Sequence, residues 1–243
     1  MNEFFIKKHS VHLWRVFVPD LLPQVENLSF ILSRDEIQRA ARFHFDEHRN
    51  RFIIARAVLR LILSLYTRIE AKNLIFINGQ RGKPFLSHHL SHLQFNVSHS
   101  HDMAVYALTS DTEIGIDIEK IEPDFSEDVA ERFFSSSEYA EFSKLPQDKK
   151  IVAFYHLWAG KEAIIKALGE GLYVPLDEFS LDAQKKIQRI NLTHQQHEYH
   201  YHLEYFSAHK QYQSAFATAQ HVNHLDHWQW SANGPVRIQA CLN

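Results

Sequence analysis

The sequence predicts an α+β fold made of two similar subdomains that meet face to face. Segments with strand periodicity and segments with helix periodicity are mixed along the chain, without the regular alternation that builds a parallel sheet. Each half contains strands and one long helix, and the 243 residues, 45% of them hydrophobic, suffice for two cores. We therefore expect an N-terminal subdomain over residues 1–110 and a C-terminal one over 111–243.

The N-terminal half begins with alternating residues at 11–18, which predict a strand. Residues 33–66 predict one or two helices. Ser33 can cap the start, Glu36 follows at the spacing of a capping box, and apolar residues then recur at helical intervals. The Gly and Pro within residues 80–84 predict a turn.

Further segments have the alternation of strands, namely residues 103–109, 114–119, 199–206 and 212–218. The last two flank a polar pair and predict a hairpin. Residues 125–142 predict a helix, and residues 149–168 predict a long amphipathic one. Gly169 and Gly171 stand where that long helix should stop.

Composition excludes several classes of protein. The net charge of −3, with 18 His counted as neutral, argues against a nucleic-acid partner. The single cysteine, Cys241, rules out a disulfide within the chain and suggests a reducing compartment. The apolar runs are too short to span a membrane, and the first residues lack the apolar core of a signal peptide. We therefore expect a cytoplasmic protein.

Charge is distributed unevenly. Residues 34–60 hold seven Arg against four acids, a balance of +3, and residues 111–141 hold eleven acids against two bases, a balance of −9. The basic segment suits an anion, whereas the acidic segment suits a cation or solvent.

Two stretches carry charged residues at spacings that suit a metal site. In a strand, Asp117 and Glu119 fall on one face, and in a helix, Trp158, Glu162 and Lys166 fall along one face. Brought together, these carboxylates and the lysine would suit a Mg²⁺ ion that holds phosphate oxygens. Taken separately, each stretch also fits a solvated sheet face or a surface ion pair on a helix.

Four signals in order make the functional hypothesis specific. They are RGKPF at 81–85, FNVSHS at 95–100, GIDIEK at 115–120 and WAGKEAIIK at 158–166, with RFFS at 132–135 between them. This combination resembles the 4′-phosphopantetheinyl transferase superfamily, specifically the surfactin-synthetase-activating type. The similarity runs from about Ser33 to about Leu181.

The resemblance implies a reaction and a site. Such enzymes transfer the 4′-phosphopantetheine arm of coenzyme A to a serine of an apo carrier protein of acyl, peptidyl or polyketide type, and 3′,5′-ADP leaves. The family uses Mg²⁺ and holds coenzyme A in a cleft between subdomains related by pseudo-two-fold symmetry. A chain with both halves of the cleft is expected to work as a monomer, without nucleic acid or membrane.

By the same resemblance, Asp117, Glu119 and Glu162 match the metal ligands. Glu162 is also the candidate to accept the serine proton, directly or through water. Lys166 matches the lysine that contacts the coenzyme A phosphates and completes the catalytic pair with Glu162.

Further positions match the nucleotide contacts of the family, namely Arg39, Lys83, Ser98 and His99, with Arg51 and Arg42 as plausible second contacts to phosphate. Glu36 departs from this pattern, because some relatives carry a base there, and so does Phe52, where a hydroxyl residue can occur. Arg49 and Arg60 are expected to be solvated.

Two other functions remain open from the residues. A Mg²⁺-dependent phosphohydrolase acting on a pyrophosphate would use the same carboxylates, and a non-catalytic coenzyme A-binding module would use the basic residues. Lys161 is expected to have a supporting role at most. The spacing of His194, His197, His200 and His202 superficially suggests metal ligands, but their polar surroundings without cysteine favour a surface.

Overall fold

The computed structural model describes residues 4–79, 82–87, 90, 92–110, 112–169 and 174–239. Arg81 of the predicted turn, the second helix stop Gly171 and the lone Cys241 lie outside these ranges.

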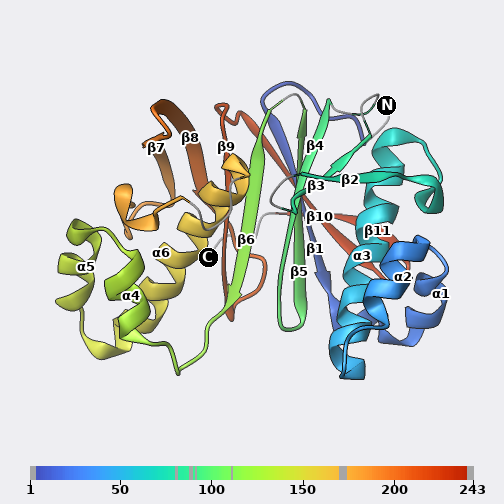
Figure 1. The fold of residues 1–243 in the computed structure, drawn as a ribbon, viewed down its shortest axis with the longest axis horizontal. Helices are drawn as coiled ribbons and strands as arrows, with labels where there is room; N and C mark the ends of the chain where they lie inside the picture. Colours follow the sequence, from blue (N-terminus) through green and yellow to red (C-terminus); the bar gives the residue numbers. More distant parts are fainter. Residues whose placement is uncertain are drawn as a thin grey trace.

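Two units with the same order of elements form the two halves of the molecule (Figure 1). The first unit contains β1 (Ser10–Phe17), α3 (Asp46–Thr67), β4 (Leu93–Ser100) and β5 (Met103–Ser110). The second contains β6 (Ile114–Lys120), α6 (Gln147–Leu168), β8 (His197–Tyr205) and β9 (Tyr212–Thr218). Their strand orders, β1-β5-β4 and β6-β9-β8, correspond, and neighbouring strands in both are antiparallel. The expected α+β class and the predicted hairpin are confirmed.

Shorter elements complete the chain. The N-terminal half adds the 3₁₀ segments η1 (Val18–Gln24) and η2 (Ala71–Asn73), the helices α1 (Val25–Ser29) and α2 (Arg34–Ala40), and the hairpin β2 (Phe76–Asn78) and β3 (Pro84–Leu86). The second half adds α4 (Glu127–Phe133), α5 (Ser136–Ser143), η5 (Leu176–Glu178) and β7 (Ile187–His194).

The helix starts follow local capping. The capping box of Ser33 and Glu36 is present at the start of α2, as the sequence predicts. The single helix predicted over residues 125–142 is instead two. Ser135 and Glu138 form a second capping box, which begins α5 directly after α4 ends. This capping box inside the predicted helix therefore divides it.

The end of the described chain returns to the first sheet. β10 (His224–Ser231) pairs in parallel with β1, and β11 (Gly234–Ile238) pairs with β10. The assignment of 111–243 to the second subdomain did not anticipate this return. Aromatic burial explains it, because Trp228 is 3% exposed and stacks on Trp14 at 5.2 Å between ring centroids.

Apolar residues gather in three clusters within the described residues. One lies between α3 and the first sheet, and a second lies between α6 and the second sheet. The third joins the two sheets and includes Val105 of β5, Ile116 of β6 and Phe216 of β9. Because strand side chains alternate, β5 serves the first cluster with Tyr106 and the third with Val105.

A polar seam, formed by Asn96, Ser98 and Ser100 of β4, joins the two halves beside this third cluster. The Asn96 side-chain oxygen accepts from the Ile116 amide at 2.9 Å, and the Ser98 hydroxyl donates to Asp117 Oδ1 at 2.9 Å. The Ser100 hydroxyl donates to Glu119 Oε2 at 3.2 Å and accepts from a β6 amide. Alternate side chains of β4 thus fix the position of β6.

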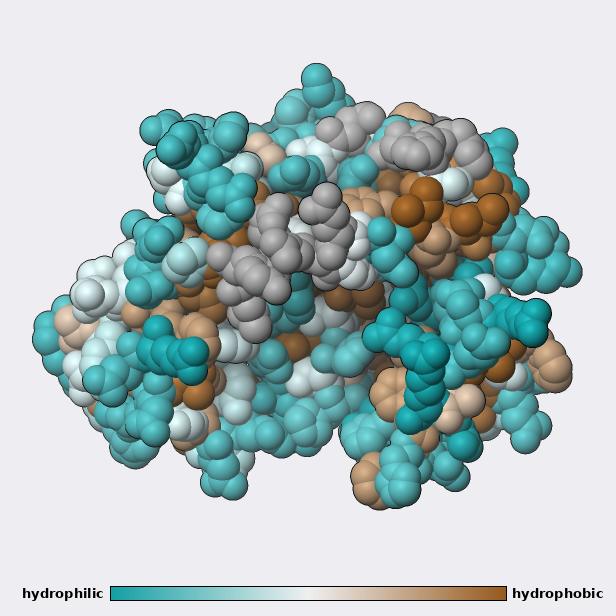
Figure 2. Space-filling view, viewed as in Figure 1, coloured by the Kyte–Doolittle hydropathy of each residue, from teal (hydrophilic) through white to brown (hydrophobic). Residues whose placement is uncertain are grey.

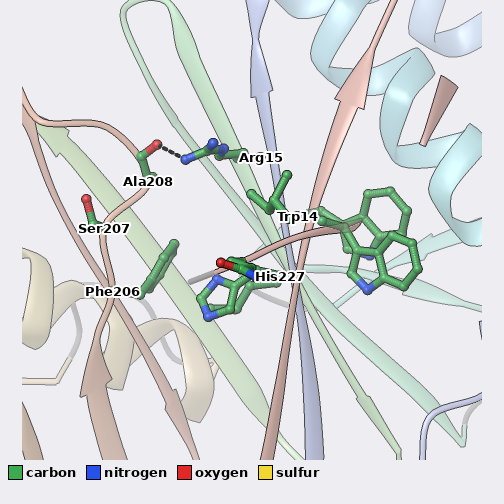
Figure 3. A pocket seen from close by; sticks show the side chains of 10 residues that line it. Trp14, Arg15, Phe206, Ser207, Ala208 and His227 are labelled. Carbon is green, nitrogen blue, oxygen red and sulfur yellow. Dashed lines mark hydrogen bonds between the residues drawn. The ribbon is translucent and has the colours of Figure 1, made fainter. Parts of the chain in front are cut away.

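A second polar link lies on another side of the interface, beside a recess of about 10 Å³. Figure 3 shows Arg15 of β1 donating to the carbonyl of Ala208, in the turn between β8 and β9, at 2.8 Å. This recess has room for about one water molecule, so it is too small for a substrate.

The β6 strand also touches the backbone of α6. A Cβ on Gly115 would lie 2.1 Å from the carbonyl oxygen of Ala163 and 2.3 Å from the amide nitrogen of Ala167. Only glycine therefore permits this close approach, which sets α6 against β6. In α6 itself, a Cβ on Gly160 would lie 2.2 Å from the Tyr205 hydroxyl. Close packing against Tyr205 therefore explains why a glycine stands inside this helix.

The surface in this view is mainly polar, with apolar groups gathered over the region of β2 and the adjoining end of α3 (Figure 2). None of the helices in the described ranges combines the length and apolar character that crossing a bilayer requires.

Replacing Gly115 with alanine should destabilise the protein, because the added methyl group forces α6 away from β6. We expect a loss of about 1–3 kcal/mol or more in the free energy of unfolding, measured by urea denaturation. Ile114→Val, at a buried neighbouring position, is the matched control and should cost about 0.5–1.5 kcal/mol. Wild-type stability of Gly115→Ala would contradict the close approach.

Candidate active site

A cavity of about 460 Å³ opens between the two halves. Elements of both units line it, with α2 and α3 at one end, β4 in the middle, and β6 and α6 at the other. Its charged and polar lining residues are Arg39, Arg56, Ser98, His99, Asp117, Glu119, Glu162 and Lys166. The structure therefore brings together seven residues that the sequence predicted for one site, and adds Arg56.

The acidic end, formed by Asp117, Glu119, Glu162 and Lys166, centres on a buried ion pair. The Lys166 ammonium lies 2.5 Å from Asp117 Oδ1 and donates to the Ser98 hydroxyl at 3.0 Å. Asp117 is 2% exposed, and its Oδ2 atom is buried without a hydrogen-bond partner among the described residues. An unpartnered buried carboxylate oxygen is costly, so this atom is available to a further ligand.

Burial and neighbouring charges shift the pKa values of the other groups at the acidic end. Burial, followed by the negative charge of Asp117, raises the pKa of Glu119 to about 7. Burial also raises the pKa of Glu162, although Lys166 opposes that shift. Burial alone would lower the pKa of Lys166, but Asp117 and the other carboxylates outweigh it and raise this pKa.

These residues suit a divalent cation. Three carboxylates and one ammonium leave the acidic end with a formal balance of −2 among the described lining residues. Oxygen ligands of this kind are those that Mg²⁺ prefers. Within the described ranges, no three His, Cys, Asp or Glu side chains already stand close enough together to hold a metal ion. Lys166 pairs with Asp117 Oδ1, so a metal ion that used this oxygen would require the lysine to move, whereas Oδ2 has no partner among the described residues.

The basic end, formed by Arg39, Arg56 and the residues that hold them, lies on α2 and α3. The Arg39 guanidinium packs over the Phe52 ring at 5.3 Å. Phe52, which stands where a hydroxyl residue can occur, therefore supports a guanidinium. Arg56 Nε lies 3.4 Å from Glu36 Oε1, and its guanidinium packs over the Phe76 ring at 5.3 Å. Arg56 was missed because nothing in the spacing distinguished it from the other arginines of this segment.

Arg60 corrects an expectation. It is 1% exposed rather than solvated, and its Nε donates to Glu36 Oε2 at 2.6 Å. Its NH1 donates to the carbonyls of Ala71 and Leu74 at 2.9 and 3.0 Å. Arg60 therefore ties α3 to η2, whereas Arg49 pairs at the surface with Asp46, as expected.

Two predicted nucleotide contacts are held outside the cavity lining. Arg51 lies 2.6 Å from Glu47 and 3.1 Å from Asp102. Lys83 donates to the carbonyls of Ile114, Lys166 and Ala167 at 2.9, 2.7 and 3.3 Å, which joins β3 to the end of α6. Burial lowers the pKa of Lys83 to about 8, although Glu113 opposes the shift.

His99 lines the cavity between the two charged ends. Burial lowers its pKa, a backbone hydrogen bond opposes the shift, and the charges of Lys166, Arg39 and Arg51 lower it further. The imidazole is therefore biased toward its neutral form, in which it can donate one hydrogen bond to a ligand.

Other candidates lie elsewhere. Lys161 is fully buried and lies 2.8 Å from Glu138, so it supports the fold rather than the cavity. The histidines of β7 and β8 are not gathered around a metal site. His200 is exposed and hydrogen-bonded to Asn191 at 2.8 Å, and His202 contacts Glu204 at 3.2 Å.

Comparison with known proteins identifies the family. A family model described as the 4′-phosphopantetheinyl transferase superfamily matches residues 113–217, and one described as the 4′-phosphopantetheinyl transferase N-terminal region matches residues 21–111. The chain is 41% identical over 166 residues to the 4′-phosphopantetheinyl transferase HetI of Nostoc sp., covering 67% of this chain and 70% of that protein.

Similarity to the 4′-phosphopantetheinyl transferase Sfp of Bacillus subtilis is 34% identity over 171 residues, covering 70% of this chain and 75% of that protein. The chain is also similar to a vertebrate protein, the L-aminoadipate-semialdehyde dehydrogenase-phosphopantetheinyl transferase of Xenopus laevis. The two are 29% identical over 167 residues, which cover 64% of this chain and 55% of that protein. The chain belongs to the 4′-phosphopantetheinyl transferase superfamily. Within that superfamily it is of the Sfp-like type.

Lys83→Met should lower stability, because it leaves three carbonyls of the subdomain junction without their donor. We expect a loss of about 1–3 kcal/mol in the free energy of unfolding, measured by urea denaturation. Lys72→Met, which removes an exposed lysine paired with Glu70, is the matched control and should change little. Unchanged stability of Lys83→Met with a raised KM for coenzyme A would instead support a contact with the nucleotide.

Proposed function

We propose that this protein transfers 4′-phosphopantetheine from coenzyme A to a serine hydroxyl of an apo carrier protein, in a Mg²⁺-dependent reaction that releases 3′,5′-ADP. The observation that carries the proposal is the polarised cavity between the two halves. An acidic end and a basic end face one cavity, and both contain residues that match the family. A substrate with two separated phosphate groups, such as coenzyme A, fits this arrangement.

The acidic end is where the bond would break. Lys166 can contact the pyrophosphate once it leaves Asp117, and Glu162 is placed beside it in the same cavity. Glu162 is the carboxylate placed to accept the serine proton, directly or through water, as the hydroxyl attacks phosphorus. The nucleotide then leaves as 3′,5′-ADP, and the carrier keeps the phosphopantetheine.

Asp117, Glu119 and Glu162 would hold the Mg²⁺ ion. The unpartnered Asp117 Oδ2 and the formal excess of negative charge support this assignment. When bound, the ion would supply charge neutralisation for the pyrophosphate. Positioning of the phosphates by Lys166 and His99 is the contribution of the chain itself.

The two charged ends argue against the two alternatives. A hydrolase acting on a bare pyrophosphate has no use for Arg39 and Arg56 at the opposite end of the cavity. A coenzyme A-binding module has no use for three crowded carboxylates, whose mutual repulsion is costly without a cation. We further propose a cytoplasmic monomer, since both halves of the cavity belong to one chain.

Intact mass spectrometry tests this function directly. An apo carrier protein incubated with this protein, coenzyme A and Mg²⁺ should gain the mass of one phosphopantetheine on its serine. Omitting the metal or adding a chelator should stop the gain. Release of phosphopantetheine into solution, with the carrier unmodified, would support the hydrolase instead.

Glu162→Gln should reduce kcat by about 10²-fold or more, because the amide cannot accept the serine proton and is a poorer metal ligand. Glu131→Gln, at an exposed position of α4, is the matched control and should leave turnover unchanged. Transfer rates at saturating coenzyme A and Mg²⁺ provide the measurement. If Glu162→Gln raised only the KM for coenzyme A, Glu162 would be a binding residue rather than a base.

A further inference from the structure

Lys166 is a cation placed inside a cluster of carboxylates. Its ammonium lies 2.5 Å from Asp117 Oδ1 and donates to the Ser98 hydroxyl, which donates to the same carboxylate oxygen at 2.9 Å. Glu119 and Glu162 line the same cavity, and neither forms an ion pair within the described ranges. Lys166 is thus the internal counter-ion of the acidic end.

The backbone of Lys166 is fixed, whereas its side chain can rotate. Lys83 donates to the Lys166 carbonyl at 2.7 Å, and a Cβ on Gly115 would lie 2.8 Å from the same carbonyl carbon. Lysine carries its charge on a flexible four-carbon stem. The ammonium can therefore leave Asp117 by side-chain rotation alone, without movement of α6.

This ammonium competes with a divalent cation for the carboxylates. A metal ion that used Asp117 Oδ1 would displace the lysine, and one held by Oδ2 would share a carboxylate with it. Like charges placed this close repel each other strongly where little water separates them. The ion pair of Lys166 and Asp117 therefore lowers the affinity of the acidic end for a metal ion.

An anion in the cavity offers Lys166 a second partner. Lys166 lines the cavity as well as contacting Asp117, so phosphate oxygens bound there can draw the ammonium away. The anion then removes the competing charge from Asp117 and adds oxygen ligands of its own. Two ligands that favour the same position of one side chain strengthen each other's binding.

We propose that Lys166 couples the binding of metal to the binding of coenzyme A, by pairing with Asp117 until the pyrophosphate of coenzyme A draws it away. This inference rests on the proposed function for the identity of the anion. The metal ion alone then binds weakly, and it binds tightly to protein that already holds the pyrophosphate. By linkage, the metal ion tightens the binding of coenzyme A by the same factor.

Binding of Mn²⁺ in the absence of any anion ligand tests the competition directly. Lys166→Met removes the ammonium and keeps a long side chain, so this variant should bind Mn²⁺ about 10-fold or more tightly than wild type. Electron paramagnetic resonance of the unbound Mn²⁺ gives both dissociation constants. An affinity equal to that of the wild type would overturn the proposal.

Lys120→Met is the matched control. Lys120 ends β6 and forms no ion pair within the described ranges, so its removal takes away a nearby positive charge without touching Asp117. Its effect on Mn²⁺ affinity should be much smaller than that of Lys166→Met. If both variants tightened Mn²⁺ equally, net charge rather than the ion pair would set the affinity, and the proposal would fail.

Thermal unfolding gives a second readout, which holds for a destabilised variant as well. Lys166→Met leaves three carboxylates without their counter-ion, so it should unfold at a lower temperature than wild type when a chelator is present. Mg²⁺ should raise its midpoint more than that of the wild type, because the metal ion no longer competes with a lysine. Lys166→Gln, which removes the charge but retains a donor, should behave in the same way. Equal shifts for all three proteins would contradict the competition.

Inorganic pyrophosphate and coenzyme A separate this proposal from the proposed function. Either anion should tighten Mn²⁺ binding to the wild type, and the gain should be about 10-fold or more smaller in Lys166→Met. Absence of any gain in the wild type would overturn the coupling. If a carrier protein stayed unmodified while pyrophosphate still tightened Mn²⁺ binding through Lys166, the proposed function would fail and the coupling would stand.

Discussion

The polar seam between β4 and β6 is the contact on which the site depends. An apolar cluster also joins the two sheets, and directional hydrogen bonds add to it. Asn96 and Ser100 accept hydrogen bonds from β6 amides, and Ser98 donates to Asp117. These bonds fix β6 and its carboxylates relative to the first unit. Gly115 then brings α6 against β6, so Glu162 and Lys166 arrive at the same cavity.

The electrostatics follow from that arrangement. Each half contributes an unbalanced cluster, three carboxylates against Lys166 on one side and three arginines against Glu36 on the other. Each cluster is electrostatically unfavourable without a ligand, because it retains like charges in a partly buried setting. At the acidic end, burial and then the charge of Asp117 raise the pKa of Glu119 to about 7, and Asp117 Oδ2 has no partner among the described residues. A divalent cation at one end and a phosphate dianion at the other would relieve both.

Local patterns in the sequence predicted much of this, because helix and strand periods, caps and turn residues act over a few positions. The carboxylate site was predictable for the same reason. The return of β10 was not, since it depends on Trp228 stacking on Trp14 across most of the chain. Nor was the place of Lys83, whose partners are backbone carbonyls of other elements. Arg56 could not be distinguished in the sequence from the other arginines of its helix, because its orientation depends on the ion pair with Glu36.

The account's central claim is that both charged clusters serve one molecule of coenzyme A together with one divalent cation. A crystal structure with coenzyme A and Mn²⁺, using the anomalous signal of the metal, tests it most directly. We predict manganese bound by Asp117 and its neighbouring carboxylates, Lys166 moved from Asp117 to phosphate, and the 3′-phosphate between Arg39 and Arg56. Coenzyme A bound outside this cavity, with the ion pair of Lys166 and Asp117 intact and no metal beside it, would contradict the account.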